Sequence, residues 1–282
     1  MSRALNALQM KRLMATPLPR SYMTYIGNLI LRLLLTIQGM GAFALITFSV
    51  LISKRRVSRA VIAPLIQRES VRAGVRLLPM FSFFAVALGL AVIGQTVAFL
   101  TTVNATSYLG TAMVLVVVRE LGPLMTAILV LLRCGTANVI ELGTARAQGE
   151  VETLEALSID PIHYFVVPRV IGMGLGVYSL TVFFIIATLF SGYIWAFLQD
   201  VPLYPGEYFQ QLARALSVWD FVIIALKSSL FGAIIAVVTC YHGLAQPLRL
   251  EHVSQATIAA LVQSLLACVL VDVLFILVYL VL

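Results

Sequence analysis

Four charged residues interrupt stretches of the sequence that are otherwise apolar: Arg119, Glu120, Lys227 and Asp272. A charged side chain at membrane depth is costly, and it usually faces a partner charge or a water-filled cavity. Two cations and two anions at a shared depth can neutralise one another, which lowers the cost of keeping them in lipid. We therefore expect the four side chains to meet near the middle of a membrane and to line a path for a polar lipid headgroup.

Packing without transport is the alternative explanation for these charges. The neighbours Arg119 and Glu120 could pair and serve stability alone. Lys227 and Asp272 could extend towards a membrane interface, although both lie far from the ends of their apolar runs. The Gly-Pro pair at 122–123 predicts a kink or a loosened hydrogen-bond ladder, which makes room beside the first two charges.

A short acidic segment, residues 150–161, has the pattern of an amphipathic helix. At helical spacing it carries an apolar face and an acidic face, made by Val151, Leu154, Leu157, Glu150 and Glu155. Pro161 ends the segment. An anionic membrane surface repels such a helix, so a protein partner fits its apolar edge better. A solvated loop helix explains the same residues equally well.

No motif in the sequence indicates catalysis, metal binding or nucleotide binding. There is no P-loop, no HExxH and no GxSxG. The three histidines are scattered near predicted loops, and the three cysteines lack paired spacing and lie mostly in apolar runs. We expect no catalytic residue, no metal site and no cofactor on this chain.

The composition indicates that lipid surrounds much of this chain. Of the 282 residues, 61% are hydrophobic and 11% are charged, and the mean hydropathy is +1.02. A soluble domain carries about 25% charged residues. Because backbone groups in lipid must be satisfied within their own segment, long apolar runs predict helices. The chain is therefore predicted to be an all-α integral membrane protein.

Five apolar runs are long enough to cross the hydrocarbon core, which takes about 20 residues. They are residues 77–103, 108–132, 170–199, 221–241 and 253–282. Residues 133–169 are predicted to be a polar cytoplasmic segment, and residues 200–220 an outer loop with interfacial aromatics. Gly172 and Gly176 have the small-xxx-small spacing that permits close helix packing within or between subunits.

Residues 1–76 form a basic amino-terminal region, whose only acidic residue is Glu69, and residues 77–282 form the five-span domain. Cytoplasmic segments carry an excess of Lys and Arg, and both flanks of the apolar segment 22–52 are basic. We therefore predict an interfacial or re-entrant helix there, which places the carboxyl terminus outside; a sixth span is the alternative. No nucleic-acid motif accompanies the basic cluster, so we expect no nucleic-acid binding.

Several motifs, in this order, resemble the MlaE/YrbE permease family. They are Arg119-Glu120-Leu121-Gly122-Pro123, Glu141-Leu142-Gly143-Thr144-Ala145-Arg146, Lys227-Ser228-Ser229-Leu230-Phe231-Gly232 and Cys240-Tyr241-His242-Gly243-Leu244. Asp272 falls where the final span of the family carries an aspartate. The resemblance extends from about residue 68 to the end of the chain.

The resemblance implies a homodimeric permease of an ABC transporter, with an amino-terminal elbow helix and five spans. It implies two cytoplasmic ATPase subunits that bind ATP, a periplasmic ring of MCE domains, and transport of phospholipid or a related lipid at a bacterial inner membrane. It also implies that residues 150–157 are the coupling helix and that a lipid pocket lies between the two subunits. The chain itself would not be an enzyme.

Two other functions account for part of the sequence. An intramembrane enzyme that modifies lipids would use the buried charges as acid and base groups, but it would need a dense carboxylate or metal motif at one membrane surface, and none is present. A membrane scaffold or sensor would explain residues 150–157 and leave the buried charges without a purpose.

Overall fold

The computed structural model describes residues 20–53, 59–103, 105, 108–198, 205–244 and 252–281. Every regular element within these ranges is helical. The chain divides into two compact units, residues 1–46 and 47–282. The first helix of the described residues, α2 (Arg20–Ser53), includes residues of both units. The functional division at residue 76 stays a prediction.

Five helical runs of the second unit are long and apolar enough to cross a membrane, which confirms the predicted all-α membrane architecture. They are Ile62–Thr102, Leu109–Ala147, Ile162–Phe197, Val218–Leu244 and Val253–Tyr279. The apolar part of α2 whose side chains are described, Thr36–Ile52, is shorter. That residues 22–52 do not cross stays a prediction.

Each run is built from one or more helical elements. The first contains α3 (Arg59–Ala73), the 3-10 turn η1 (Val75–Leu77), α4 (Leu78–Leu88), the π-helical η2 (Gly89–Ile93) and α5 (Gly94–Thr102). The second contains α6 (Leu109–Met113), the π-helical η4 (Val114–Leu121), α7 (Gly122–Val130), the π-helical η5 (Leu131–Gly135) and α8 (Thr136–Ala147). The others are the π-helical η6 (Ile162–Val166) with α10 (Val167–Leu198), then α12 (Val218–Leu244) and α13 (Val253–Val281). Between the runs lie α9 (Glu150–Ala156) and α11 (Pro205–Ala215).

The helices extend beyond the predicted apolar runs where charged residues follow apolar ones. The second helical run continues to Ala147, past residue 132, and the third begins at Ile162, before residue 170. The predicted limits of the membrane-crossing segments stay a prediction. The predicted outer loop contains the helix α11. Hydropathy ends a span where charges begin, but a helix continues past that point when its charged side chains find partners on neighbouring helices.

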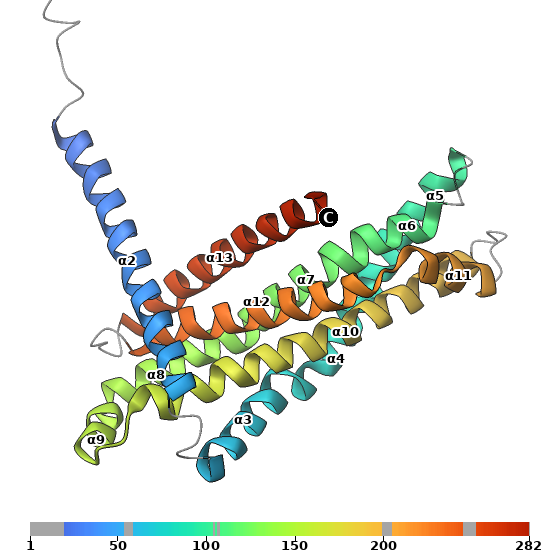
Figure 1. Cartoon of the computed structure of the whole chain (residues 1–282). Coiled ribbons are helices and arrows are strands. Elements are labelled where there is room, and N and C mark those ends of the chain that lie inside the picture. The colour runs from blue at the N-terminus through green and yellow to red at the C-terminus, as the bar shows by residue number, and fades with distance from the viewer. Residues whose placement is uncertain are drawn as a thin grey trace, which may run out of the picture. The chain divides into compact units, whose positions relative to one another are not determined.

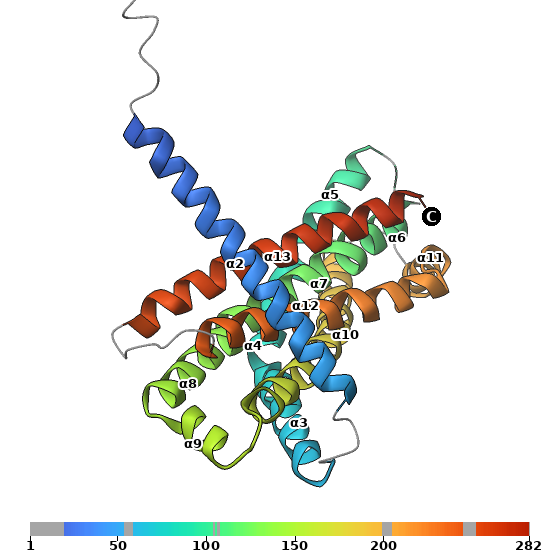
Figure 2. The same cartoon turned by 60° about the vertical axis from the view of Figure 1, so that its left-hand side comes forward.

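The central helix of the bundle is α10, which packs against α3, α4, α7 and α12 (Figures 1 and 2). Its glycines bring it close to α3. A Cβ on Gly172 would lie 2.6 Å from the Cβ of Glu69, and a Cβ on Gly176 would lie 2.9 Å from the Cβ of Ala73. The small-xxx-small spacing therefore serves packing within the chain.

Two buried clusters form the core of the second unit. In the first, the Phe81 and Phe184 rings meet edge to face with their centroids 6.0 Å apart, and Phe231 is buried nearby. The second lies towards α11, whose Tyr208 donates a hydrogen bond to the Leu189 carbonyl at 3.4 Å. Burial raises the pKa of Tyr208 to about 12, so its hydroxyl keeps its proton at physiological pH.

The three cysteines of the chain, Cys134, Cys240 and Cys268, are all buried and form no disulfide. Each lies within a span and behaves as a small apolar side chain, as predicted from the absence of paired spacing.

The two ends of the bundle carry different short helices. Figure 1 shows α9 at the end where α3 begins and α8 ends, whereas α11 lies at the opposite end beside α6. The basic residues of α3 place the α9 end on the side predicted to be cytoplasmic. The two ends of the bundle therefore differ in the short helix that each carries.

Candidate functional site

Lys227 lies at the centre of a buried charge network. The residue is 0% exposed. Its Nζ lies 3.0 Å from Oε2 of Glu120 and 2.6 Å from Oδ1 of Asp272, and it donates a hydrogen bond to the Arg119 carbonyl at 3.0 Å. The second, fourth and fifth spans therefore meet at this lysine, and three of the four predicted side chains lie together.

The side chain of Arg119 has a different partner from the one expected. Its Nε lies 2.9 Å from Oδ1 of Asp220, and one of its terminal nitrogens donates to Oδ2 at 3.2 Å. Its guanidinium carbon lies 4.8 Å from the centroid of the Tyr279 ring, which adds a cation–π contact. The prediction that all four side chains meet directly was therefore wrong for Arg119, which joins the network through its backbone.

Pro123 explains why Lys227 reaches the backbone of Arg119. In a regular helix the Arg119 carbonyl would accept a hydrogen bond from the residue four positions later, and that residue is a proline without an N–H. The Lys227 ammonium donates to this carbonyl instead. The preceding turns are π-helical through Leu121, so the predicted loosening of the hydrogen-bond ladder is confirmed.

The network is uneven in exposure and in charge. Five ionisable side chains, two cations and three carboxylates, give it a formal charge of −1: Arg119, Lys227, Glu120, Asp220 and Asp272. The side chains of Glu120 and Arg119 are 29% and 27% exposed, while the other three are buried. Among the described residues no group of three or more His, Cys, Asp or Glu side chains is arranged to hold a metal ion. A polar molecule can therefore approach the network only through Glu120 and Arg119.

Asp220 and Tyr279 were missed by the sequence analysis. Asp220 had been placed in the outer loop, yet it lies in the first turn of α12 and is 2% exposed. The spacing Ser217-x-x-Asp220 could have located it, because an acid three residues after a serine is a helix-start signal. In the structure the Ser217 N–H donates to Oδ2 of Asp220 at 2.8 Å.

The helix α9 forms where a coupling helix was predicted. Gly149, with φ of +78°, turns the chain from α8 into α9. The predicted apolar face divides into an anchor and a tip. Val151 is buried, Leu154 is half-buried, and Leu157, just past the end of the helix, is 66% exposed. Only the tip of this face, at Leu157, is exposed.

The acidic side of α9 is open, and the helix is tied to two spans. Glu150 and Glu155 are exposed. Glu152 lies 3.9 Å from a terminal nitrogen of Arg146 on α8, and the other terminal nitrogen of Arg146 donates to the Leu244 carbonyl at the end of α12. Through Arg146, a movement of α9 could therefore displace the ends of the second and fourth spans, which carry Glu120 and Lys227.

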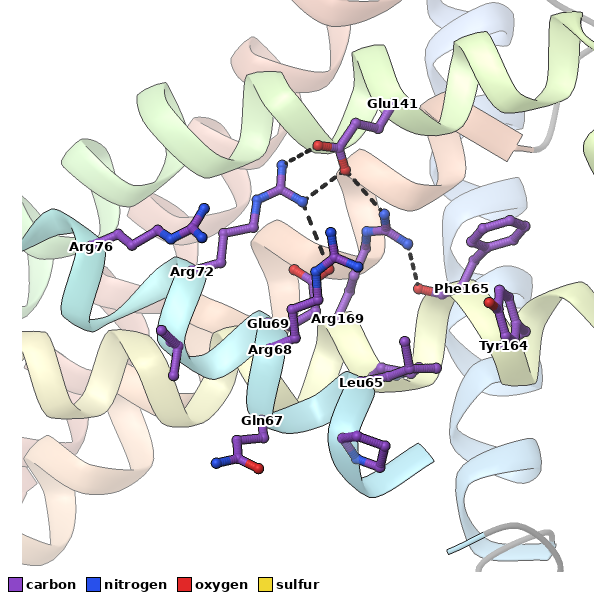
Figure 3. A pocket seen from close by; sticks show the side chains of 13 residues that line it. Leu65, Gln67, Arg68, Glu69, Arg72, Arg76, Glu141, Tyr164, Phe165 and Arg169 are labelled. Carbon is purple, nitrogen blue, oxygen red and sulfur yellow. Dashed lines mark hydrogen bonds and ion pairs between the residues drawn. The ribbon is translucent and has the colours of Figure 1, made fainter. Parts of the chain in front are cut away.

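A second ion cluster lies near the α9 end of the bundle and was not predicted. Arg72 of α3 donates two hydrogen bonds to the carboxylate of Glu141 on α8, at 2.7 and 2.6 Å (Figure 3). Arg169 of α10 donates to the same carboxylate at 3.3 Å and to the Phe165 carbonyl at 2.9 Å. The residues come from three spans, so local sequence patterns give no signal for this cluster.

Comparisons with known proteins identify the family. The family model described as "Permease MlaE" matches residues 66–278. A probable ABC transporter permease protein of Synechocystis is 35% identical over 167 residues, which are 58% of this chain and 62% of the relative. The chloroplastic protein Trigalactosyldiacylglycerol 1 of Arabidopsis thaliana is 32% identical over 203 residues, 71% of this chain and 57% of the relative. A probable ABC transporter permease protein of Rickettsia typhi is 27% identical over 227 residues, 80% and 86% of the two chains.

The chain spans less than two thirds of the length of the first two of these relatives. The family match, by contrast, covers well over half of the chain and includes Arg119, Glu120, Glu141, Lys227 and Asp272. This chain belongs to the MlaE permease family.

Proposed function

We propose that the chain is the membrane-spanning subunit of an ATP-driven ABC transporter, which moves phospholipid or a related lipid between a bacterial inner membrane and an MCE-domain protein outside it. Membership of the MlaE permease family, the permease names of its relatives and the five apolar spans support this proposal. In it the chain works as a homodimer and is not an enzyme. ATP is bound and hydrolysed by separate cytoplasmic subunits, and no cofactor is needed on this chain.

The buried charge network is the observation that carries the proposal. Five ionisable side chains inside an apolar bundle cost free energy that well-packed apolar side chains would avoid. The network exposes one carboxylate, Glu120, and one guanidinium, Arg119, at its edge. We assign these two to contact with the lipid headgroup on its path, and Lys227 and Asp272 to holding Glu120 in place within the same path.

The tip of α9 supports docking of an ATPase. Leu157 is a large apolar side chain exposed at the end predicted to be cytoplasmic, and the acidic residues Glu150 and Glu155 lie beside it. In this proposal Val151 and Leu154 fix α9 to the bundle, while Leu157 inserts into the ATPase. The link through Arg146 would then carry the motion of the ATPase to the spans.

Purification of the tagged full chain from its native membranes tests the proposal. A P-loop ATPase and an MCE-domain protein should be retained with the chain. In proteoliposomes, fluorescent phospholipid should move between the membrane and the MCE-domain protein only when hydrolysable ATP is present. Chemical change of the phospholipid by the chain without an ATPase would contradict the proposal and favour an intramembrane enzyme.

A second experiment isolates the coupling step. Leu157→Asp places a charge in the proposed docking contact, so retention of the ATPase should fall by about tenfold, as expected when a buried apolar anchor is lost from an interface. Val218→Asp is the matched control, because Val218 is also a largely exposed apolar residue and lies at the opposite end of the bundle. Membrane insertion should be unchanged in both variants. Equal ATPase retention in the two variants would contradict docking on α9.

A further inference from the structure

A charged cavity of about 710 Å³ opens near the α9 end of the bundle, and no step proposed above uses it. Its walls come from α3, η1, α8, η6 and α10 (Figure 3). Four arginines and two glutamates line it: Arg68, Arg72, Arg76, Arg169, Glu69 and Glu141. The formal charge of the lining is therefore +2, which favours an anionic ligand.

The two glutamates are already engaged with two of the arginines. Arg72 lies 2.6 Å from one Glu141 oxygen and 3.7 Å from Glu69, and Arg169 lies 3.3 Å from Glu141. Arg68 and Arg76 are exposed at the cavity, and neither has an ion-pair partner within the described part of the chain. These two guanidiniums keep their hydrogen-bond donors available for a ligand.

An apolar groove of about 430 Å³ adjoins the cavity, and Gln67 and Val71 line both. The groove runs between α3, η1 and α4 on one side and α10 on the other, with Val75, Leu78 and Leu175 in its walls. Gly74 and Gly176 also line it. A basic cavity that continues into an apolar groove matches a ligand with an anionic head and a hydrocarbon tail.

The depth of the cavity matches the headgroup layer of a membrane. Arg76 comes directly before the uncharged run 77–103, and Arg169 comes directly before the uncharged run 170–199. Both arginines therefore lie at the edge of the hydrocarbon core, where the phosphates of a leaflet are found. The groove residues Leu78 and Leu175 follow them into the apolar part of the spans.

We propose that this cavity and groove bind one anionic phospholipid of the leaflet on the α9 side, with its phosphate at Arg68 and Arg76 and one acyl chain against Val71, Val75 and Leu175. An inorganic phosphate would use the cavity and leave the groove without a purpose. An acidic segment of a protein would likewise not need an apolar groove that leads into the membrane. The site lies apart from the Lys227 network, and lipid binding there requires no ATPase.

Lipid binding to the purified full chain in detergent tests the proposal. Native mass spectrometry should show saturable binding of dioleoylphosphatidylglycerol that exceeds binding of dioleoylphosphatidylcholine. The double variant Arg68→Gln/Arg76→Gln should weaken phosphatidylglycerol binding by about tenfold or more, since each cation near a membrane surface contributes about fivefold. Arg214→Gln is the matched control, because Arg214 is an exposed arginine on α11 at the other end of the bundle.

A second variant tests the apolar half of the site. Ser179 is exposed in the groove, so Ser179→Trp should fill the groove without changing any charge. This variant should weaken phosphatidylglycerol binding severalfold. It should leave unchanged the extent to which added inorganic phosphate competes with that binding. Thermal unfolding in detergent, expected to stay within a few degrees of wild type, checks that each variant is folded.

Three outcomes would overturn the proposal. Equal binding of the two lipids, or no effect of the double arginine variant, would show that the cavity does not recognise an anionic headgroup. Competition by inorganic phosphate without an effect of Ser179→Trp would assign the cavity to a free anion. Loss of ATPase co-purification in the double variant with unchanged lipid binding would assign it to a protein contact. The first two outcomes leave the proposed transport untouched, because it uses other residues, whereas the third would move part of the ATPase contact from α9 to this cavity.

Discussion

The Lys227 network and the Glu141 cluster use the same chemistry in different surroundings. Both join three spans through ion pairs. Lys227 is completely enclosed, whereas the Glu141 side chain is 48% exposed and the cavity beside it is open. Removing one partner from a buried group of charges leaves an uncompensated charge, which costs about 3–5 kcal/mol. Exposed pairs contribute about 0–1 kcal/mol, because solvent and salt replace the lost partner.

The difference shows which cluster can exchange partners. Arg68 and Arg76, the exposed arginines beside the Glu141 cluster, can bind and release a ligand with little effect on the fold, because neither holds an ion pair within the described part of the chain. Rearranging the interior of the Lys227 network would leave buried charges unpaired, which costs more free energy. Only the edge of the network, at Glu120 and Arg119, is available to a passing molecule. Under the two proposals, stability and lipid recognition should therefore be separable at the exposed cluster and closely linked at the buried one.

The largest effect is expected for Lys227→Met. The substitution leaves the carboxylates of Glu120 and Asp272 without their shared cation, so it should lower the free energy of unfolding by about 3–5 kcal/mol. Accumulation in membranes and thermal unfolding in detergent measure this. The triple variant Lys227→Met/Glu120→Gln/Asp272→Asn removes the unpaired charges and should recover much of the loss. A single variant as stable as wild type would show that the network is not held by its charges.

A smaller effect on stability and a large effect on transport are expected for Glu120→Gln. Lys227 keeps Asp272 and the Arg119 carbonyl as partners, so the loss of stability should be about 1 kcal/mol. In the proposed transport path, however, the exposed carboxylate is gone, and ATP-dependent lipid transfer should fall by at least about tenfold with normal ATPase docking. Normal transfer by this variant would leave the network with a structural role only.

The smallest effect is expected at the exposed cluster. Glu141→Gln removes the carboxylate shared by Arg72 and Arg169, yet it should change the free energy of unfolding by about 1 kcal/mol, because the site is open to solvent. Raising the ionic strength from about 0.05 to about 0.5 M should reduce even this difference. Melting curves of wild type and variant at both salt concentrations measure it. A salt-independent loss as large as that of Lys227→Met would contradict the comparison.

The sequence predicted the spans well because hydropathy is a local property. Their number, their helical character and the presence of α9 all follow from runs of neighbouring residues. The helix ends could not be predicted in this way, because they depend on distant partners. The helix that contains the second span continues past Arg133 to a region where Glu141 meets Arg72, a residue 69 positions earlier, and no local pattern contains that pairing.

The buried network was only partly predictable for the same reason. The cost of a charge in lipid indicated that Glu120, Lys227 and Asp272 would find one another, and they do. The partner of Arg119 could not be found in this way, because Asp220 stands at a span end, where a charge needs no special explanation. Whether a charge at the edge of an apolar run faces water or a buried partner is decided by the packing of the helices.

Because all three cysteines are buried, the native chain should react only weakly with thiol reagents. A single new cysteine at the surface can therefore report its own side of the membrane without removal of the native ones. Gly206→Cys on α11 has open space around its Cβ, and Glu155→Cys lies on the exposed side of α9. A membrane-impermeant maleimide should label position 206 in right-side-out vesicles and position 155 in inverted ones, and the reverse pattern would contradict the predicted orientation. The burial of the native thiols therefore allows single introduced cysteines to map which side of the membrane each loop faces.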